Sequence, residues 1–254
     1  MTRTDADGVA TLTLQRPGLS SALRTDLLGV VREMAADESV RAVLLTGTGR
    51  AFCVGQDLAE HIESLRGNAA TSLSVVENEY NPLILALAAL PVPVVVGING
   101  ACAGAGLGIA LAGDLRVAAA GSKFTTAFTG VGLSSDSALA SRLVHSVGRS
   151  RATQLLLTPD PFTAETAEQW GLVHQVVPAE EVLPEAQALA ARLATGPTAA
   201  YRAMKTVLAT AATDPLEETL ALEARLQTRL GQTADHREAV EAFLEKRTPR
   251  FTGR

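Results

Sequence analysis

A run of small residues, Gly104-Ala105-Gly106, follows an uncharged valine-rich segment and opens the apolar stretch GLGIALAG. We expect a strand over residues 93–98 and a helix from about Gly104. A helix start without bulky side chains lets a ligand approach the backbone closely. Its first N–H groups have no partner inside the helix and carry partial positive charge. The pattern predicts a corner that binds oxygen and can polarise the carbonyl of an acyl group, although close packing of strand and helix would also explain the small residues.

Other residue types that commonly do chemistry are sparse. The four histidines, at positions 61, 145, 174 and 236, include no pair at metal-ligand spacing, so we predict no metal centre. The two cysteines, Cys53 and Cys102, do not form a CxxC pair. We expect both to be small buried side chains in a protein of a reducing compartment. The sequence contains no GxSxG motif of a serine hydrolase.

The composition is that of a globular protein with a large core. The chain has 254 residues, of which 47% are hydrophobic, 19% charged and only 4% aromatic, with a net charge of −5. A negative charge without a basic cluster argues against binding nucleic acid. No apolar signal-peptide core follows Met1, which favours a cytoplasmic protein. The stretch between Glu79 and Asp114 has no charged residue, but prolines and glycines interrupt it, so we expect buried elements and no membrane span.

Strand patterns alternate with helix patterns until about residue 178. We expect strands at 8–15, 40–46, 93–98, 114–119 and 172–177. A first helix should begin near Ser20, Ser21 or Thr25, and a later one near Asp136 or Ser137. A further helix is expected over residues 73–90. Only helices are expected afterwards, at 180–195, 197–211, 214–231 and 235–246. The order predicts an α/β core over residues 1–195 and a helical C-terminal region over 196–254.

Several segments together resemble the crotonase family, the enoyl-CoA hydratase/isomerase superfamily. VRAVLLTGTGRAFCVGQDL is similar to the family's first fingerprint, and PVPVVVGINGACAGAGLGIALAGD to its second. TAETAEQWGLVHQVV and EAFLEKRTPRFTG are similar to its later landmarks, at the expected separations. The resemblance implies a spiral of ββα units with C-terminal helices that assemble trimers, or hexamers as dimers of trimers. It also implies an acyl-coenzyme A substrate, with coenzyme A entering as part of the thioester and no permanently bound cofactor.

The resemblance also implies an oxyanion hole, formed by the backbone N–H groups of Gln56 and Ala105. One such donor contributes roughly 3–4 kcal/mol to barrier lowering. Residues that match positions bordering coenzyme A or the acyl group are Ala22, Leu23, Cys53, Gly55, Asp57, Leu58, Gly104, Phe128, Leu133, Phe243 and Lys246. Two of them have a simpler interpretation, since Asp57 can cap a helix and Lys246 can be a solvated charge at a helix end.

The two glutamates that hold water in hydratases of this family are absent. Gly108 and Phe128 stand at the matching positions, and neither can exchange a proton. Asp136 matches a position where some isomerases of the family have a catalytic aspartate. A dehalogenase branch of the family has its nucleophilic aspartate at the same position. An apolar wall of Phe128 and Leu133 would raise its pKa. The alternative is that Asp136 only caps the helix that follows.

Four functions therefore stay open. The leading hypothesis is isomerisation of a double bond in an unsaturated acyl-CoA, with Asp136 as acid and base. The others are an enoyl-CoA hydratase with an atypical site, an enzyme that uses Asp136 as a nucleophile on an aryl-CoA, and a subunit that binds acyl-CoA without chemistry.

Overall fold

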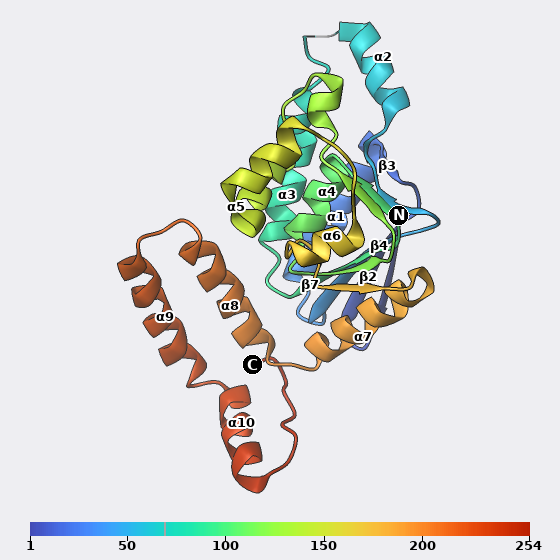
Figure 1. The fold of residues 1–254 in the computed structure, drawn as a ribbon. Helices are drawn as coiled ribbons and strands as arrows, with labels where there is room; N and C mark the ends of the chain where they lie inside the picture. The colour runs from blue at the N-terminus through green and yellow to red at the C-terminus, as the bar shows by residue number, and fades with distance from the viewer. Residues whose placement is uncertain (69) are drawn as a thin grey trace.

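The computed structural model describes residues 1–68 and 70–254 and has the α/β fold expected from the sequence. Its largest sheet has the strand order β1-β2-β4-β7-β9-β12 (Figure 1). The strands are β1 (Thr2–Ala6), β2 (Val9–Leu14), β4 (Ala42–Gly47), β7 (Val94–Ile98), β9 (Leu115–Ala119) and β12 (Gln175–Val177). All neighbours pair in parallel except the hairpin of β1 with β2. Parallel strands covered on both faces read as continuous apolar runs, which is why β4 and β7 were visible in the sequence.

A smaller sheet with the order β11-β10-β8-β5 packs beside the first. It consists of β5 (Ala51–Cys53), β8 (Ala101–Ala103), β10 (Lys123–Thr125) and β11 (Phe162–Thr163). A third pairing joins β3 (Gly18–Leu19) to β6 (Gly55–Gln56). The chain segments that leave the large sheet after β4, β7 and β9 each contribute a short strand to the smaller sheet. The chain path is therefore a spiral of repeated strand–strand–helix turns.

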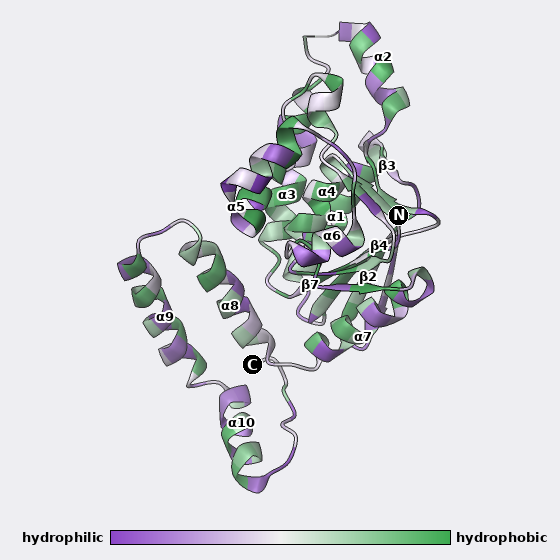
Figure 2. Ribbon diagram, in the orientation of Figure 1, coloured by the Kyte–Doolittle hydropathy of each residue, from purple (hydrophilic) through white to green (hydrophobic). Residues whose placement is uncertain are grey.

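Helices cover both faces of the large sheet. On one face lie α1 (Ser21–Ala36), a π-helical turn Val76–Tyr80, α3 (Asn81–Ala88), α4 (Ala105–Ala112) and α5 (Leu139–Leu157). On the other face lies α7 (Val182–Ala194), whose small apolar residues pack against β4, β7 and β9 (Figure 1). Helix α4 is coloured on the hydrophobic side of the scale in Figure 2, as expected for a helix that is buried on all sides.

The remaining helices are peripheral. They are α2 (Leu58–Asn68), α6 (Ala164–Gln169), α8 (Thr198–Ala211), α9 (Leu216–Leu230) and α10 (Ala234–Glu245). Helices α8 to α10 extend away from the sheets, and α2 projects at the opposite end (Figure 1). The division at residue 195 into two domains remains a prediction, although α7 packs on the sheet and α8 follows the turn after it.

Most expected elements are present, with three corrections. Strand β1 was not predicted, because TRTDA is a polar edge strand that lacks apolar alternation. The segment 73–90 was expected as one helix but divides into the π-helical turn and α3. The helix expected from Asp136 or Ser137 begins at Leu139 and continues to Leu157 across a kink at Gly148.

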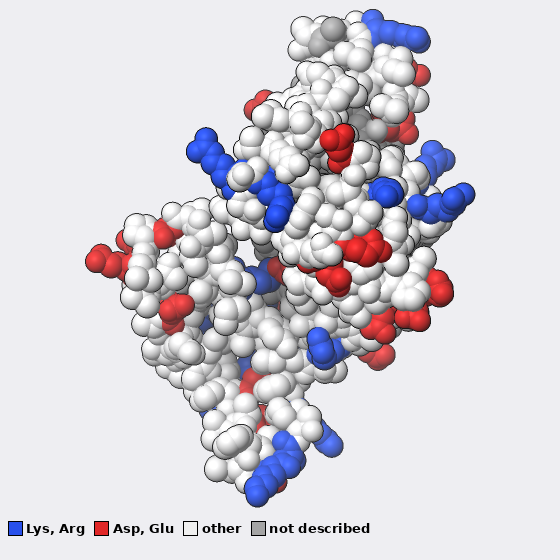
Figure 3. Space-filling model, in the orientation of Figure 1, with Lys and Arg blue, Asp and Glu red and all other residues white. Residues whose placement is uncertain are grey.

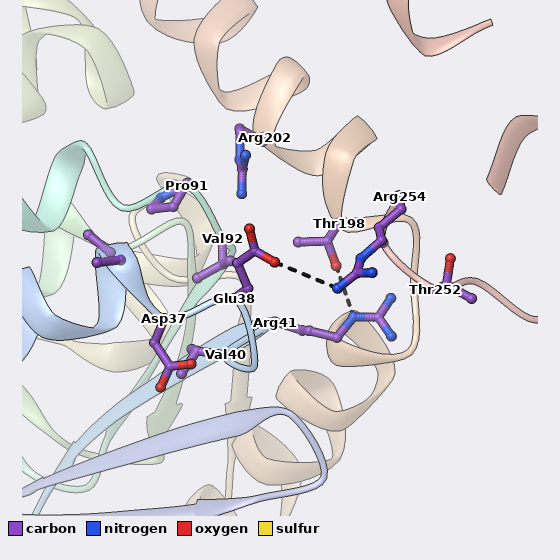
Figure 4. Close-up of a pocket in the computed structure, with 13 residues that line it drawn as sticks. Asp37, Glu38, Val40, Arg41, Pro91, Val92, Thr198, Arg202, Thr252 and Arg254 are labelled. Atoms are coloured by element: carbon purple, nitrogen blue, oxygen red, sulfur yellow. Dashed lines mark hydrogen bonds and ion pairs between the residues drawn. The ribbon is translucent and has the colours of Figure 1, made fainter. Parts of the chain in front are cut away.

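The chain end returns to the core at a cavity of about 480 Å³, drawn in Figure 4. Arg41, just before β4, donates to Thr198 at 3.0 Å and to the carbonyl oxygens of Gly196 at 2.6 Å and Phe251 at 3.3 Å. Because these contacts involve all three guanidinium nitrogens, this arginine fixes α8 and the tail to the core. It is not available as an anion site.

Charges of both signs intermix on the face drawn in Figure 3. Among the described residues, no helix is long and apolar enough to cross a membrane.

Candidate active site

The two loops singled out in the sequence meet at the start of α4. A Cβ placed on Gly106 would lie 2.6 Å from the carbonyl carbon of Cys53 and closer still to its oxygen. A Cβ on Gly55 would lie 3.3 Å from the amide nitrogen of Ala105. The backbone after β5 therefore lies directly against the first turn of α4, and only glycine fits at the contact. This brings the strand carrying Gln56 to the amide of Ala105.

Hydrogen bonds to the segment before α1 hold the Gln56 loop in place. The amides of Val54 and Asp57 donate to the carbonyl oxygens of Pro17 and Leu19 at 2.8 and 3.3 Å. Gly55 between them has φ +87°, which a residue with a side chain rarely adopts. The loop therefore has one defined backbone conformation.

The Asp57 side chain is a helix cap, one of its two expected roles. Its Oδ1 accepts from the amides of Ala59 at 2.9 Å and Glu60 at 3.2 Å, in the first turn of α2. The carboxylate is thereby engaged with the protein's own backbone. Any contact of this residue with coenzyme A would be made through the neighbouring backbone.

Asn99 connects the end of β7 to the other loop. Its Oδ1 accepts from the Gly47 amide at 3.1 Å, and its Nδ2 donates to the carbonyls of Gly49 and Ala51 at 3.0 and 3.1 Å. The Asn99 side chain thus links the segment that follows β4 to the end of β7, and these two segments lead to the corner at the start of α4.

Phe128 lies at the same corner. Its ring carbon Cζ would be 3.8 Å from a Cβ on Gly104, and the ring is partly buried against the core. Ala127 before it has φ +65°, and the Leu133 amide donates to the Phe128 carbonyl at 3.0 Å. Phe128 and Leu133 are therefore joined in one turn, and Phe128 lies beside the glycine corner.

Asp136 does not cap α5. The N-cap position is Ala138, no side chain caps this helix, and the Asp136 carbonyl accepts from the Leu139 amide at 2.9 Å. Ser137 and Ala138 have φ values of +52° and +57°. Two successive left-handed residues that are not glycine each cost of order 1–3 kcal/mol and are typical of functional sites. Asp136 therefore does not have the capping role that was the alternative to catalysis.

This turn lies on Gly108, the position of the missing hydratase glutamate. A Cβ on Gly108 would be 2.6 Å from both the Cβ and the carbonyl oxygen of Ser137. The segment carrying Asp136 therefore fills the space that a side chain at position 108 would need.

The environment of Asp136 favours its neutral form more than water does. Burial raises the pKa of the half-buried carboxyl, while the Ser137 hydroxyl, which donates to Oδ1 at 2.7 Å, opposes the shift. A carboxyl with a raised pKa is suited to taking and returning a proton near neutral pH. The Cys53 thiol is no competitor, because burial raises its pKa to about 12.

The other predicted contact residues divide into two groups. Ala22 and Leu23 open α1 and line a cavity of about 270 Å³, while Leu58 is exposed at the start of α2. Phe243, 82% exposed, and Lys246, the C-cap of α10, lie far from the corner within one chain (Figure 1). A contact between this pair and a ligand at the corner would have to come from a neighbouring chain.

Two buried residues near the site were missed. Arg24, 3% exposed, lies 5.0 Å from the ring centroid of Tyr80, and its Nε donates to Glu79 at 2.8 Å. Burial raises the pKa of the Tyr80 phenol, and the charge of Arg24 opposes that shift. An arginine inside an otherwise apolar helix pattern was the available signal. Nothing in the sequence paired it with Tyr80.

In the described part of the chain, no group of three or more His, Cys, Asp or Glu residues could hold a metal ion.

Comparison with known proteins places this geometry in a family. A sequence profile described as enoyl-CoA hydratase/isomerase matches residues 4–254. A probable enoyl-CoA hydratase of Rhodobacter capsulatus is 43% identical, over 98% of this chain and 96% of that protein. The 1,2-epoxyphenylacetyl-CoA isomerase of Escherichia coli is 41% identical, over 97% and 96%. A crystal structure of a putative enoyl-CoA hydratase/isomerase from Mycobacterium abscessus superposes with a TM-score of 0.97 at 48% identity, covering 100% of this chain and 99% of that one. The chain belongs to the enoyl-CoA hydratase/isomerase family, the crotonase superfamily, whose members act on acyl-CoA substrates.

Proposed function

We propose that the protein moves a double bond along the chain of an unsaturated acyl-CoA. The thioester oxygen accepts hydrogen bonds from the backbone N–H groups of Gln56 and Ala105. Asp136 removes a proton from the α-carbon, and the electron pair shifts into a dienolate whose negative charge rests on the thioester oxygen. The same carboxyl returns the proton at the γ-carbon, so no atom is gained or lost.

The observation that carries this proposal is the packing of the Asp136 turn on Gly108. Water addition in this family relies on a carboxylate at that position, and here the space is closed by Ser137. Isomerisation needs only one carboxyl that holds and releases a proton, and Asp136 has the raised pKa that this role requires. The name of the Escherichia coli relative, an acyl-CoA isomerase, agrees with this reaction class.

Coenzyme A enters as part of the substrate, and we infer no permanently bound cofactor or metal ion. Cys53, Gly55 and Leu58 would border its pantetheine arm. We also propose a homotrimer or a dimer of trimers, because α8 to α10 expose large apolar side chains, namely Met204, Leu208, Leu216, Leu220, Val240, Phe243 and Leu244. Light scattering should then give the mass of three or six chains.

The test is turnover of 3-hexenoyl-CoA and crotonyl-CoA by wild type and Asp136→Asn, with products identified by mass. Wild type should convert the first substrate to its 2-enoyl isomer without a mass change. Asp136→Asn should lose roughly 10²–10⁴-fold in kcat, the usual contribution of a general acid–base, while still binding the thioester. Asp214→Asn, the same change in the exposed turn after α8, is the matched control.

Three outcomes would contradict the proposal. Unchanged turnover by Asp136→Asn would remove this residue from the mechanism. Addition of water to crotonyl-CoA, without isomerisation of the other substrate, would make the enzyme a hydratase. Binding without turnover of either thioester would favour the aryl-CoA or non-catalytic alternatives.

A further inference from the structure

Ser137 makes a hydrogen bond that the proposed mechanism does not use. Its hydroxyl donates to Oδ1 of Asp136 at 2.7 Å, and its side chain is 1% exposed. A hydrogen bond between the side chains of adjacent residues is unusual, because neighbouring side chains diverge on a helix and point to opposite faces of a strand. The φ of +52° at Ser137 departs from both geometries. This left-handed backbone brings the hydroxyl back to the preceding carboxyl.

Packing places Ser137 within one helical turn of the proposed oxyanion donor. A Cβ on Gly108 would lie 2.6 Å from both the Cβ and the carbonyl oxygen of Ser137, so the two backbones are in direct contact. The Gly108 amide donates to the Gly104 carbonyl at 3.2 Å, and this bond closes the turn of α4 that contains Ala105. Ser137 therefore has a fixed position relative to the Ala105 amide.

The hydroxyl makes the two oxygens of the Asp136 carboxyl different. Ser137 donates to Oδ1, and in a neutral carboxyl the better acceptor is the oxygen without the proton. The proton of the neutral form therefore belongs on Oδ2. Burial raises the pKa of Asp136, and the hydrogen bond from Ser137 opposes that shift because it is stronger to the charged carboxylate. In both forms, Oδ2 is the oxygen left for a substrate proton.

We propose that Ser137 is a positioning residue that makes Oδ2 of Asp136 the oxygen of proton transfer. Oδ2 takes the proton from the α-carbon, and the electron pair of the broken C–H bond moves into the dienolate. The same oxygen then returns the proton to the γ-carbon, while Oδ1 accepts from Ser137 throughout. Only one carbon separates the α- and γ-carbons, so a single oxygen can serve both on one face of the dienolate. The inference rests on the proposed function and names the atom that performs it.

The experiment compares Ser137→Ala and Ser137→Gly with wild type on 3-hexenoyl-CoA between about pH 5 and 9. Both variants lack the donor, so kcat should fall about 10- to 100-fold, as expected for a misplaced catalytic group, while KM stays within about threefold. The carboxylate is also less stabilised, so the rise of kcat/KM with pH should move up by about one pH unit. Ser134→Ala removes an exposed hydroxyl from the same segment and should change none of these values.

The two variants separate the hydroxyl from the backbone of the turn. Glycine adopts a positive φ without strain, so Ser137→Gly should melt at a higher temperature than Ser137→Ala. If Ser137 only held the turn, the glycine variant would keep wild-type turnover and the wild-type pH profile, and that result would overturn the inference. An unshifted pH profile in both variants would overturn it as well.

Failure of the proposed function can be recognised separately. If wild type does not isomerise 3-hexenoyl-CoA, the proposed function fails, and infrared titration of the Asp136 carboxyl decides about Ser137. The band of a protonated carboxyl that is absent in Asp136→Asn identifies this group. Persistence of that band to higher pH in Ser137→Ala would still support the hydrogen bond that occupies Oδ1. The same titration midpoint in Ser137→Ala and wild type would refute it.

Discussion

Gly106→Ala tests whether close backbone packing positions the oxyanion donors. The added Cβ would lie 2.6 Å from the Cys53 carbonyl carbon and 2.8 Å from the Cys53 Cβ. Carbon contacts prefer about 3.5–4.0 Å, so α4 and the loop must separate by about 0.9 Å or more. The obstacle is largely backbone, and a rotamer change cannot relieve it. The separation would move the Ala105 amide away from that of Gln56.

Two effects of different size should follow. Overpacking of this kind costs about 1–3 kcal/mol in the free energy of unfolding. Misplacement of one oxyanion donor costs about 2.7–4 kcal/mol of transition-state stabilisation, or roughly 10²–10³ in kcat. The variant should therefore remain folded at moderate temperature and lose most of its isomerase activity. Urea unfolding and turnover of 3-hexenoyl-CoA measure the two quantities separately.

Gly29→Ala is the matched control. A Cβ at this exposed position in α1 meets nothing within 4 Å, so alanine should stabilise the protein by about 0.5–1 kcal/mol and leave turnover unchanged. If Gly106→Ala unfolds less readily than expected and also retains wild-type turnover, the packing does not position the donors. If Gly106→Ala is less stable but fully active, only the link between packing and catalysis is refuted.

Two further predictions concern buried carboxyls. The pKa of Asp136 is higher in the folded protein than in the unfolded chain. The contribution of its neutral carboxyl to the free energy of unfolding is therefore lost as the pH rises from the unfolded pKa through the folded pKa. Asp136→Asn keeps an acceptor for the Ser137 hydroxyl and should unfold at a higher urea concentration than wild type at pH 7. Below about pH 4 the two proteins should unfold at the same urea concentration. A lower urea midpoint for the variant at pH 7 would contradict the argument. Asp235, 4% exposed, accepts from the amides of Thr252 at 2.7 Å and Gly253 at 2.8 Å. Asp235→Asn should lose about 1–3 kcal/mol in the free energy of unfolding and expose the tail to carboxypeptidase. A tail as resistant as that of wild type would show that its other contacts, such as that of Arg41 with the Phe251 carbonyl, hold it without this carboxylate.

Local signals in the sequence were sufficient for most elements. β4 and β7 are buried on both faces and therefore appear as apolar runs, and Ser20 was among the possible caps of α1 and does accept from the Leu23 amide. β1 was missed because an edge strand has one exposed side and no obligatory apolar pattern. The hairpin turn Asp7-Gly8, with both φ values positive, was the signal that could have revealed it.

The sequence by itself determined the family, the order of strands and helices, and the small residues at the start of α4. Each of these depends on residues close together in the chain or on fingerprints that are continuous in sequence. It also identified Asp136 as the remaining carboxyl but left its role open, because a helix cap and an acid–base have the same local pattern.

The tertiary structure decided what lies next to Asp136. The N-cap position at Ala138 shows that the aspartate does not cap α5, and the contact of Ser137 with Gly108 shows that the turn beside Asp136 leaves no room for a side chain at position 108. The pairing of Arg24 with Tyr80 likewise depends on two helices that are far apart in the chain. Burial results from many long-range contacts, which no local sequence pattern encodes. The raised pKa of Asp136 and the buried hydroxyl of Tyr80, which has no hydrogen-bond partner among the described residues, both depend on it.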